Sequence, residues 1–274
     1  MTYLYYVQSL KDSLSAAKVL SATGEKSVSN SPSKVLLFSP HPDDECITGL
    51  LPLRLMNELG MHIINIPVTF GSNKNRQAER ATELANTCKY LGWSNHLEHS
   101  DLRNLELIDI VKILTEYQPK AIFFPHEKDW NSRHISTNHL LWQALEAMPQ
   151  DFSCLVIETE YWGAMDDPNL MIESDVESLA TLVSATSFHV GEVTRNPYHL
   201  SLPFWMQDNV RRGSELVGGQ GETAPPFTFA TLYRIRRWHN QQLSQHLDQN
   251  RTVPSEGNHL KEIFQWKSSS LKTN

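Results

Sequence analysis

The sequence has few cysteines and lacks long apolar runs, and both absences narrow the class of protein. Its 274 residues include three cysteines, Cys46, Cys88 and Cys154, which are odd in number and widely spaced. Disulfide-rich secreted domains use a denser, even set, so these cysteines predict reduced core thiols and a cytoplasmic location. No stretch approaches the roughly 18 apolar residues of a membrane span, and no basic segment leads into an apolar block. We therefore expect no membrane span and no secretion.

A surplus of positive charge is also absent. The chain has 24 basic and 31 acidic residues, a net charge of −7, and its basic residues are scattered apart from residues 234–238. This charge balance argues against nucleic acid as a main partner. The glycine-rich stretch 218–221 is not followed by Lys-Ser/Thr, which excludes a P-loop. A composition of 40% hydrophobic and 20% charged residues is typical of a globular protein. It is compatible with assembly into a homo-oligomer.

Strand-like and helix-like segments alternate along most of the chain. Runs rich in apolar residues predict strands over residues 34–40, 62–71, 120–126, 152–162 and 227–235, and the alternation suggests a further short strand near 96–100. Helical spacing predicts helices over residues 46–60, 75–92, 104–117, 136–148 and 175–190. Alternation of this kind predicts an α/β, Rossmann-like fold, with a mostly parallel sheet that helices cover on both faces.

The remaining segments frame this domain. We expect an N-terminal helix and linker over 1–33, a single α/β domain over 34–240, and a polar tail over 241–274. Residues 195–226 contain several prolines and the sequence GGQGETAPP, which favours an ordered loop region or lid beside the site. The prediction is therefore a regular sheet followed by an irregular C-terminal extension.

The sequence His41-Pro-Asp-Asp-Glu45 directly follows the predicted strand 34–40. In an open parallel sheet, ligands bind beyond the carboxyl ends of the strands, where this motif is expected to lie. Three carboxylates there are also typical of an acidic helix N-terminus, with a histidine present by chance. His41 and Asp44 are separated by a span that can direct an imidazole nitrogen and a carboxylate oxygen at one ion. A catalytic zinc site would need one more protein ligand from elsewhere.

A second group of polar residues follows the predicted strand 120–126. It contains His126, Asp129, His134 and His139, a local excess of histidine. His126 and His139 could each have a structural role at a strand end or on a helix face. His134 lies close to the start of a predicted helix, which makes it the better candidate for a third ligand.

Together these segments resemble the LmbE-like, PIG-L-type zinc-dependent N-acetylglucosaminyl de-N-acetylase family. The family's first motif, a strand followed by His-Pro-Asp-Asp-Glu, is present at 41–45. Its second, a histidine motif, resembles DWNSRH at 129–134. Residues 68–80 are similar to the family's strand, glycine turn and Arg-x-x-Glu helix. The resemblance covers roughly residues 34–195.

The resemblance implies one Zn²⁺ ion held by His41, Asp44 and His134. A zinc-bound water would attack the amide of an acetyl group, and Asp43 would act as the general base. Asn131 stands where the family often has a histidine that stabilises the oxyanion, so it could donate only a neutral hydrogen bond. Glu45 would support the turn through hydrogen bonds to backbone groups. 

The implied substrate is a small glycoconjugate with an N-acetylglucosamine-type group, which makes the chain an amide hydrolase acting on non-peptide C–N bonds. The candidate substrate-binding residues are Arg76, Asp101, Tyr161, His189 and Arg212. Each also has a plainer interpretation: an exposed helix charge for Arg76, for example, or core packing for Tyr161.

Two other functions are compatible with the same residues. One is a metal-dependent phosphoesterase, which would be favoured by a second, bridging metal site. The other is a catalytically weak protein that binds metal and glycoconjugates, since Asn131 replaces a histidine of the family.

Overall fold

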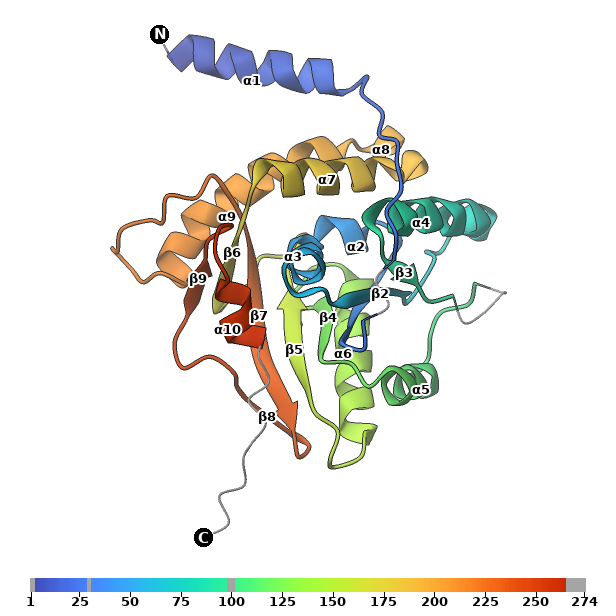
Figure 1. Cartoon of the computed structure of the whole chain (residues 1–274). Helices are drawn as coiled ribbons and strands as arrows, with labels where there is room; N and C mark the ends of the chain where they lie inside the picture. Colours follow the sequence, from blue (N-terminus) through green and yellow to red (C-terminus); the bar gives the residue numbers. More distant parts are fainter. Residues whose placement is uncertain (1–2, 29–30, 98–101, 265–274) are drawn as a thin grey trace.

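The computed structural model describes residues 3–28, 31–97 and 102–264 of the chain. Its strands form one 9-stranded sheet in the order β3-β2-β1-β4-β5-β7-β6-β9, with β8 paired to β7 (Figure 1). The strands are β1 (Lys34–Ser39), β2 (His62–Pro67), β3 (Ser94–Asn95), β4 (Ala121–Pro125), β5 (Cys154–Thr159), β6 (Leu170–Ser174), β7 (Phe229–His239), β8 (Gln242–Gln245) and β9 (Arg251–Val253).

The helices before β6 largely alternate with the strands. They are α1 (Tyr3–Ala17), α2 (Asp44–Ile47), α3 (Leu50–Leu59), η1 (Lys74–Arg76), α4 (Gln77–Leu91), α5 (Leu107–Tyr117) and α6 (Ser132–Ala147). Those after β6 are α7 (Val176–Ser187), α8 (Val190–Arg195), η2 (Tyr198–Ser201), α9 (Leu202–Leu216) and α10 (His259–Phe264).

The parallel part of the sheet contains β1 to β5. Strand β1 lies between β2 and β4, β2 pairs with β3, and β4 pairs with β5, all in parallel. Strand β7 then runs antiparallel to both β5 and β6, and β9 is parallel to β6. The predicted fold class, a mostly parallel sheet flanked by helices, is confirmed.

Alternating side chains of β1 divide the core into two layers. Val35 and Leu37 pack in one cluster with apolar residues of α2, α3, α4 and α7. Leu36 and Phe38 pack on the opposite face with residues of α5 and α6. This period of two is that of a strand buried on both faces, and it explains why β1 reads as a continuous apolar run.

Two predicted helix ends coincide with glycines in the left-handed conformation. Gly60 ends α3 with φ 65°, and Gly92 ends α4 with φ 75°. Residues with a Cβ rarely adopt this conformation, so glycine is the favoured residue where the chain leaves the helix and turns into the next strand.

The segment 195–226 differs from the predicted loop or lid, because much of it is helical. It contains η2 and the 15-residue helix α9, whose second position is Pro203. A proline in the first turn of a helix loses no hydrogen bond. Pro203 therefore lies at the start of a helix, where the sequence predicted a loop. Leu202 and Met206 of α9 are fully buried in the core.

Strand β6 and the ordered elements beyond residue 240 were not predicted from the sequence. Strand β6 has only five residues, and β8 and β9 have four and three, too few to show a clear period. Strand β9 nevertheless pairs with β6, and Leu260 of α10 is fully buried. The uncertain strand predicted over 96–100 is observed at Ser94–Asn95, and residues 98–101 lie outside the described residues.

Helix α1 lies apart from the body of the molecule (Figure 1), and none of its residues is buried. Across the described part of the chain, none of the helices combines the length and apolar character required to cross a membrane.

Candidate active site

The first half of the site is the loop between β1 and α2. Asp43 in this loop has φ 120°, a conformation that is rare for any residue other than glycine and costs about 1–3 kcal/mol. The carboxylates of the same motif hold the loop: Glu45 accepts a hydrogen bond from the Asp43 N–H at 2.8 Å, and Asp44 accepts one from the His41 N–H at 2.9 Å. Backbone strain at a buried carboxylate is a feature of functional positions.

The second half follows β4, the parallel neighbour of β1 in the sheet. Asp129 accepts a hydrogen bond from the Asn131 N–H at 2.8 Å, and Asn131 in turn accepts one from the Arg133 N–H at 2.9 Å. Asn131 thereby caps α6, and His134 occupies the first turn of this helix. Because β1 and β4 are adjacent and parallel, their two loops meet at the same edge of the sheet.

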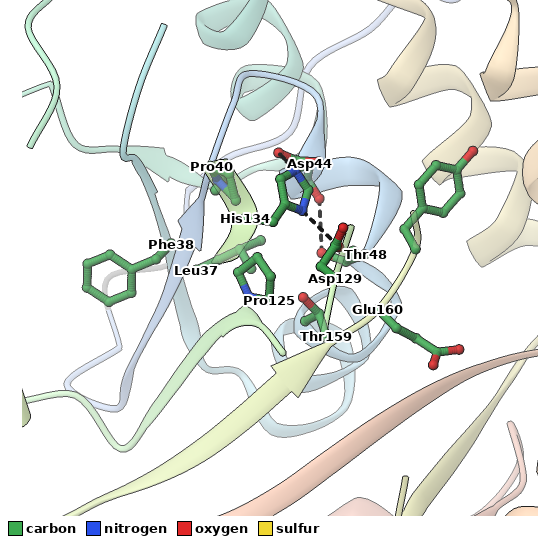
Figure 2. Close-up of a pocket in the computed structure, with 12 residues that line it drawn as sticks. Leu37, Phe38, Pro40, Asp44, Thr48, Pro125, Asp129, His134, Thr159 and Glu160 are labelled. Atoms are coloured by element: carbon green, nitrogen blue, oxygen red, sulfur yellow. Dashed lines mark hydrogen bonds and ion pairs between the residues drawn. The ribbon is translucent and has the colours of Figure 1, made fainter. Parts of the chain in front are cut away.

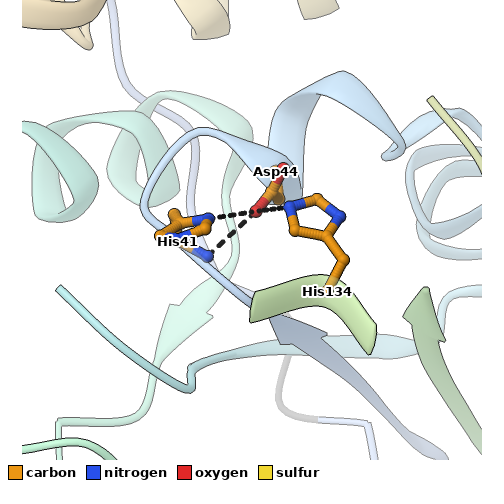
Figure 3. A group of neighbouring side chains, drawn as sticks. All are labelled: His41, Asp44 and His134. Atoms are coloured by element: carbon orange, nitrogen blue, oxygen red, sulfur yellow. Dashed lines mark hydrogen bonds and ion pairs between the residues drawn. The ribbon is translucent and has the colours of Figure 1, made fainter. Parts of the chain in front are cut away.

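His41, Asp44 and His134 converge at this edge, as Figure 3 shows. Each offers one ligand atom, and these atoms lie within 4.8 Å of one another. Oδ2 of Asp44 is 3.3 Å from Nε2 of His134 and 3.5 Å from Nδ1 of His41. Ligand atoms around a tetrahedral zinc ion, at about 2.0–2.1 Å from the metal, stand about 3.3 Å apart. The spacing therefore fits a zinc ion.

The surroundings of His134 also fit a metal ligand. Its Nδ1 lies 3.2 Å from Oδ2 of Asp129 (Figure 2). Its buried Nε2 makes no hydrogen bond, although it faces Oδ2 of Asp44 at 3.3 Å. Histidines that bind metals commonly donate the other ring N–H to a carboxylate, which fixes the tautomer and the ring orientation. Asp129 fits this supporting position, and Nε2 is left for the metal.

The charges of the site favour a cation. Burial by itself would lower the pKa of His134, but Asp44 and Asp129 outweigh it and raise that pKa to about 10. Burial would raise the pKa of Asp44, but His134 and His41 hold it well below its usual range. The proton on His134 takes the place of a metal, and metal binding requires its release.

Asp43 lies beside this triad in a different environment. Burial, followed by the negative charge of Asp44, raises the pKa of Asp43 to about 7. The Tyr198 hydroxyl donates a hydrogen bond to Oδ2 of Asp43 at 2.7 Å, and the guanidinium of Arg80 lies 3.8 Å from the same atom. A carboxylate with a pKa near neutrality is suited to accept a proton and return it.

His41, Asp43 and Asp44 line a cavity of about 430 Å³. This is within the range of about 300–1,000 Å³ that is typical of small-molecule sites. The lining residues are His41, Asp43, Asp44, Arg80, Trp130, Asn131, Trp162, Glu192, Arg195, Asn196 and Tyr198. A smaller hollow of about 10 Å³ lies beside His134 and Asp129 (Figure 2), with room for about one water molecule.

The other residues singled out in the sequence are placed in several ways. Asn131 lines the cavity, whereas Glu45 is fully buried beneath Asp43. Tyr161 lines the smaller hollow and packs edge-to-face on Trp162 and Trp205, with ring centroids 4.8 and 5.0 Å apart. 

His189, Arg76 and Arg212 are each paired with a carboxylate of the protein. His189 has no exposed surface, and its Nε2 lies 2.7 Å from Oε1 of Glu45, so direct contact with a substrate does not fit its position. Arg76 is paired with Glu192 at 2.7 Å, and Arg212 with Glu160 at 2.5 Å. Both guanidinium groups hold secondary-structure elements together. Asp101 lies outside the described residues.

Comparison with protein families gives one match. The model of the PIG-L family, described as GlcNAc-PI de-N-acetylase, matches residues 36–145, which include both halves of the site. The resemblance predicted from the sequence is therefore confirmed. No curated protein matches the chain significantly.

Solved structures share the fold with this PIG-L region and with much of the remaining chain. N,N'-diacetylchitobiose deacetylase from Pyrococcus horikoshii has a TM-score of 0.56 and 17% identity, over 74% of this chain and 83% of its own. The 4-carboxy-2-hydroxymuconate hydratase GalB from Pseudomonas putida KT2440 has a TM-score of 0.55 and 16% identity, over 74% and 95%. The zinc-inhibited form of teicoplanin deacetylase Orf2 has a TM-score of 0.54 and 13% identity, over 74% and 97%. At these identities the likeness shows the fold alone.

Three residues of the site were not given a role from the sequence. Asp129 was noted only as part of a motif, although its position five residues before His134 was a usable signal. Tyr198 lies far along the chain from Asp43, yet its hydroxyl donates a hydrogen bond to that residue. Arg80 was not considered; it lies on α4, donates to the Pro42 carbonyl at 2.9 Å, and no sequence pattern connects it to this loop.

Proposed function

We propose that the chain is a zinc-dependent de-N-acetylase that removes an acetyl group from an N-acetylated amino sugar. The observation that carries the proposal is the convergence of ligand atoms of His41, Asp44 and the buried His134 within 4.8 Å, beside a carboxylate with a raised pKa. The match to the PIG-L family supports the choice of substrate, because that family is described by de-N-acetylation of an N-acetylglucosamine group.

His41, Asp44 and His134 would hold the metal, and Asp129 would orient His134. Bound zinc supplies a Lewis acid that polarises the amide carbonyl and lowers the pKa of water to about 7. Two histidines and one carboxylate form a donor set common in catalytic zinc sites, which leave a coordination position open.

Asp43 is the proposed general base. It would accept the proton of the attacking water and deliver it to the amine that leaves, both at its carboxylate oxygens. The hydrogen bond from Tyr198 orients this carboxylate, and Glu45 fixes the strained backbone that carries it. Asp43 lines the cavity, so the proton transfers would occur where a substrate has access.

Asn131 is the proposed donor to the negative charge that develops on the carbonyl oxygen. Its side-chain oxygen is engaged in capping α6, so the amide NH₂ is the group presented as a donor. Removing one such donor typically lowers the rate by roughly 10²- to 10³-fold. A neutral amide here would be weaker than a charged histidine, and we expect a modest turnover number.

The fold by itself does not decide the reaction, because a hydratase is among the similar structures. A two-metal phosphoesterase finds little support. Besides the triad, the described residues contain one other potential metal-binding group, Glu45, Cys46 and His189, and it is entirely buried. It cannot share a bridging ligand with the cavity side of the site.

Acetate release tests the proposal. The zinc-loaded chain is incubated with a panel of N-acetylglucosamine conjugates, and acetate and free amine are quantified together with bound zinc. Asp43→Asn should keep its zinc and lose roughly 10²- to 10⁴-fold in rate, the usual contribution of a general base. Asp151→Asn, at an exposed turn before β5, is the control and should behave as the parent chain.

Two results would count against this assignment. Full zinc loading with no acetate released from any conjugate would reject the deacetylase function. Retained activity in Asp43→Asn would place the general base elsewhere.

A further inference from the structure

Among the α-helices that the structure describes, α1 alone has no buried residue. None of its side chains belongs to the hydrophobic clusters of the body, and the helix lies apart from the sheet and the helices that cover it (Figure 1). The chain joins the body further along, where the Lys26 N–H donates a hydrogen bond to the Lys89 carbonyl at 3.0 Å. An isolated helix of about 12–15 residues is only marginally stable in water. Helix α1, with 15 residues, therefore needs a surface that covers its apolar side.

One side of α1 carries apolar residues at alternating spacings of four and three. This apolar seam consists of Tyr3, Val7, Leu10, Leu14 and Ala17. Its average repeat of about 3.5 residues is that of helices that pack along one another in a coiled coil, whereas a helix that covers a sheet presents a broader stripe. The seam therefore fits another helix.

The opposite side of α1 argues against a membrane surface as the partner. It contains Gln8, Ser9, Asp12 and Ser15 and has no lysine or arginine. Helices that lie on membranes are typically rich in basic residues on the polar side. Helix α1 has one lysine and one aspartate, so it is neutral in a chain whose net charge is −7. Two copies of this helix can approach each other without repulsion, whereas an anionic membrane would repel the rest of the chain.

The apolar surface of α1 is large enough for a reversible dimer. Tyr3 and Tyr6 are 90% and 52% exposed, and Leu4 and Val7 are 77% and 59% exposed. Since one aromatic side chain can bury about 150–250 Å², these residues and the leucines of the seam offer on the order of 600 Å² per copy. Standard interfaces bury about 800 Å² per partner, and weaker ones bury less. A dimer held by α1 alone is therefore expected to dissociate in the micromolar range.

We propose that two copies of this chain form a reversible dimer in which their α1 seams pack antiparallel. In this order Tyr3 lies against Leu14 of the second copy and Val7 against Leu10, so four apolar layers close around a two-fold axis. The helix dipoles then oppose each other, and the two negatively charged bodies lie at opposite ends of the helix pair. The inference is independent of the proposed function, because α1 lies outside residues 36–145 and does not line the cavity.

Sedimentation velocity of the full chain from about 1 to about 100 μM tests the proposal, because this range brackets a micromolar dissociation constant. The parent chain should shift from monomer to dimer. The double variant Leu10→Ala/Leu14→Ala should raise the dissociation constant by at least about 10-fold, since it removes apolar area from both copies. Alanine favours the helix, so α1 itself is retained. Tyr5→Ala is the matched control, because Tyr5 is 59% exposed and lies on the side of α1 opposite the seam. All variants should keep the thermal midpoint of the monomer.

Disulfide cross-linking tests the antiparallel order. The native cysteines are buried, so an introduced cysteine on α1 is the reactive thiol. In an oxidised equimolar mixture of Val7→Cys and Leu10→Cys chains, the antiparallel order predicts disulfides mainly between the two different chains. Disulfides only between identical chains would overturn that order.

Three further results would overturn the dimer itself. The first is a parent chain that stays monomeric at about 100 μM, a concentration well above the expected dissociation constant. The second is a dimer that is equally tight in Leu10→Ala/Leu14→Ala, or weakened to the same extent in Tyr5→Ala. The third is a monomer that co-sediments with neutral or anionic phospholipid vesicles and loses this binding in the double variant, which would assign the seam to a membrane surface.

Discussion

Among the described residues, two buried histidines contact carboxylates of the same motif, and their surroundings suit different roles. His134 contacts Asp44, and His189 contacts Glu45, the next residue along. Each also belongs to a group of three potential metal ligands. The difference lies in what surrounds each ring. The Nε2 of His134 has no hydrogen-bond partner and lies at the triad, whereas the Nε2 of His189 lies 2.7 Å from Glu45 and 3.1 Å from Thr87.

The third member of each group separates them further. Asp44 is ionised, because its pKa is held well below the usual range, whereas burial raises the pKa of the Cys46 thiol well above its ordinary value. A protonated thiol is a poor metal ligand. Glu45 is in addition engaged with the Asp43 N–H. Residue types and proximity therefore do not identify a metal site; an ionised carboxylate that lines the cavity does, which the group of His134 has and the group of His189 lacks.

The largest effect on zinc binding is expected from the removal of His134. His134→Ala deletes one of three proposed ligands, and zinc affinity should fall by more than the roughly 10- to 100-fold typical of a supporting residue. Bound zinc is measured by elemental analysis after dialysis against a fixed free zinc concentration. His139→Ala, an exposed histidine of the same helix α6, is the control and should retain one zinc ion. Zinc lost from the control and kept in His134→Ala would reject our choice of ligand.

A smaller effect is expected when the partner of His134 is changed. Asp129→Asn keeps an acceptor for the Nδ1–H of His134 and removes the negative charge, so zinc affinity should fall by roughly 10- to 100-fold. Competition with a chromophoric chelator at constant pH measures the change, because the proton on His134 also competes for the site. An affinity equal to that of the parent chain would show that Asp129 only shapes the loop.

The sequence was sufficient to predict the elements of the fold that have a long apolar pattern. The run 34–40 and the helix ended by Gly92 are observed close to their predicted bounds. The helix predicted over 46–60 is observed as two helices, α2 and α3, separated by Thr48 and Gly49. Strand β6 and helix α9 were missed for physical reasons. Five residues do not define a period, and prolines near the start of α9 are compatible with both a loop and a first helical turn.

The part of the candidate site that lies within one local motif could be predicted from the sequence. The spacing of His41 and Asp44 is visible in the sequence, but the approach of His134 depends on β4 lying beside β1 rather than beside its sequence neighbour β3. Tyr198 reaches Asp43 from 155 positions further along the chain, across a segment that has no period. Such contacts follow from the packing of helices on the sheet, which local sequence does not encode.

The smallest effect on bound zinc is expected from substitution of His189. This substitution tests directly whether His189 and His134 have different roles. His189→Phe should keep one zinc ion, but it leaves Oε1 of the buried Glu45 without a donor and should lower the free energy of unfolding by about 1–3 kcal/mol, less in His189→Gln, which retains a donor. Burial alone would lower the pKa of His189, yet Glu45 outweighs it and raises that pKa. The stabilisation by the ion pair is thus fully present below about pH 6.5, the ordinary value, and is lost as the pH rises through the folded-state value. Denaturant unfolding of the parent chain and of His189→Phe, from about pH 6 to about pH 9, should show the gap between them narrowing. A gap that widens with pH, or zinc lost from His189→Phe, would contradict the purely structural role that separates His189 from His134.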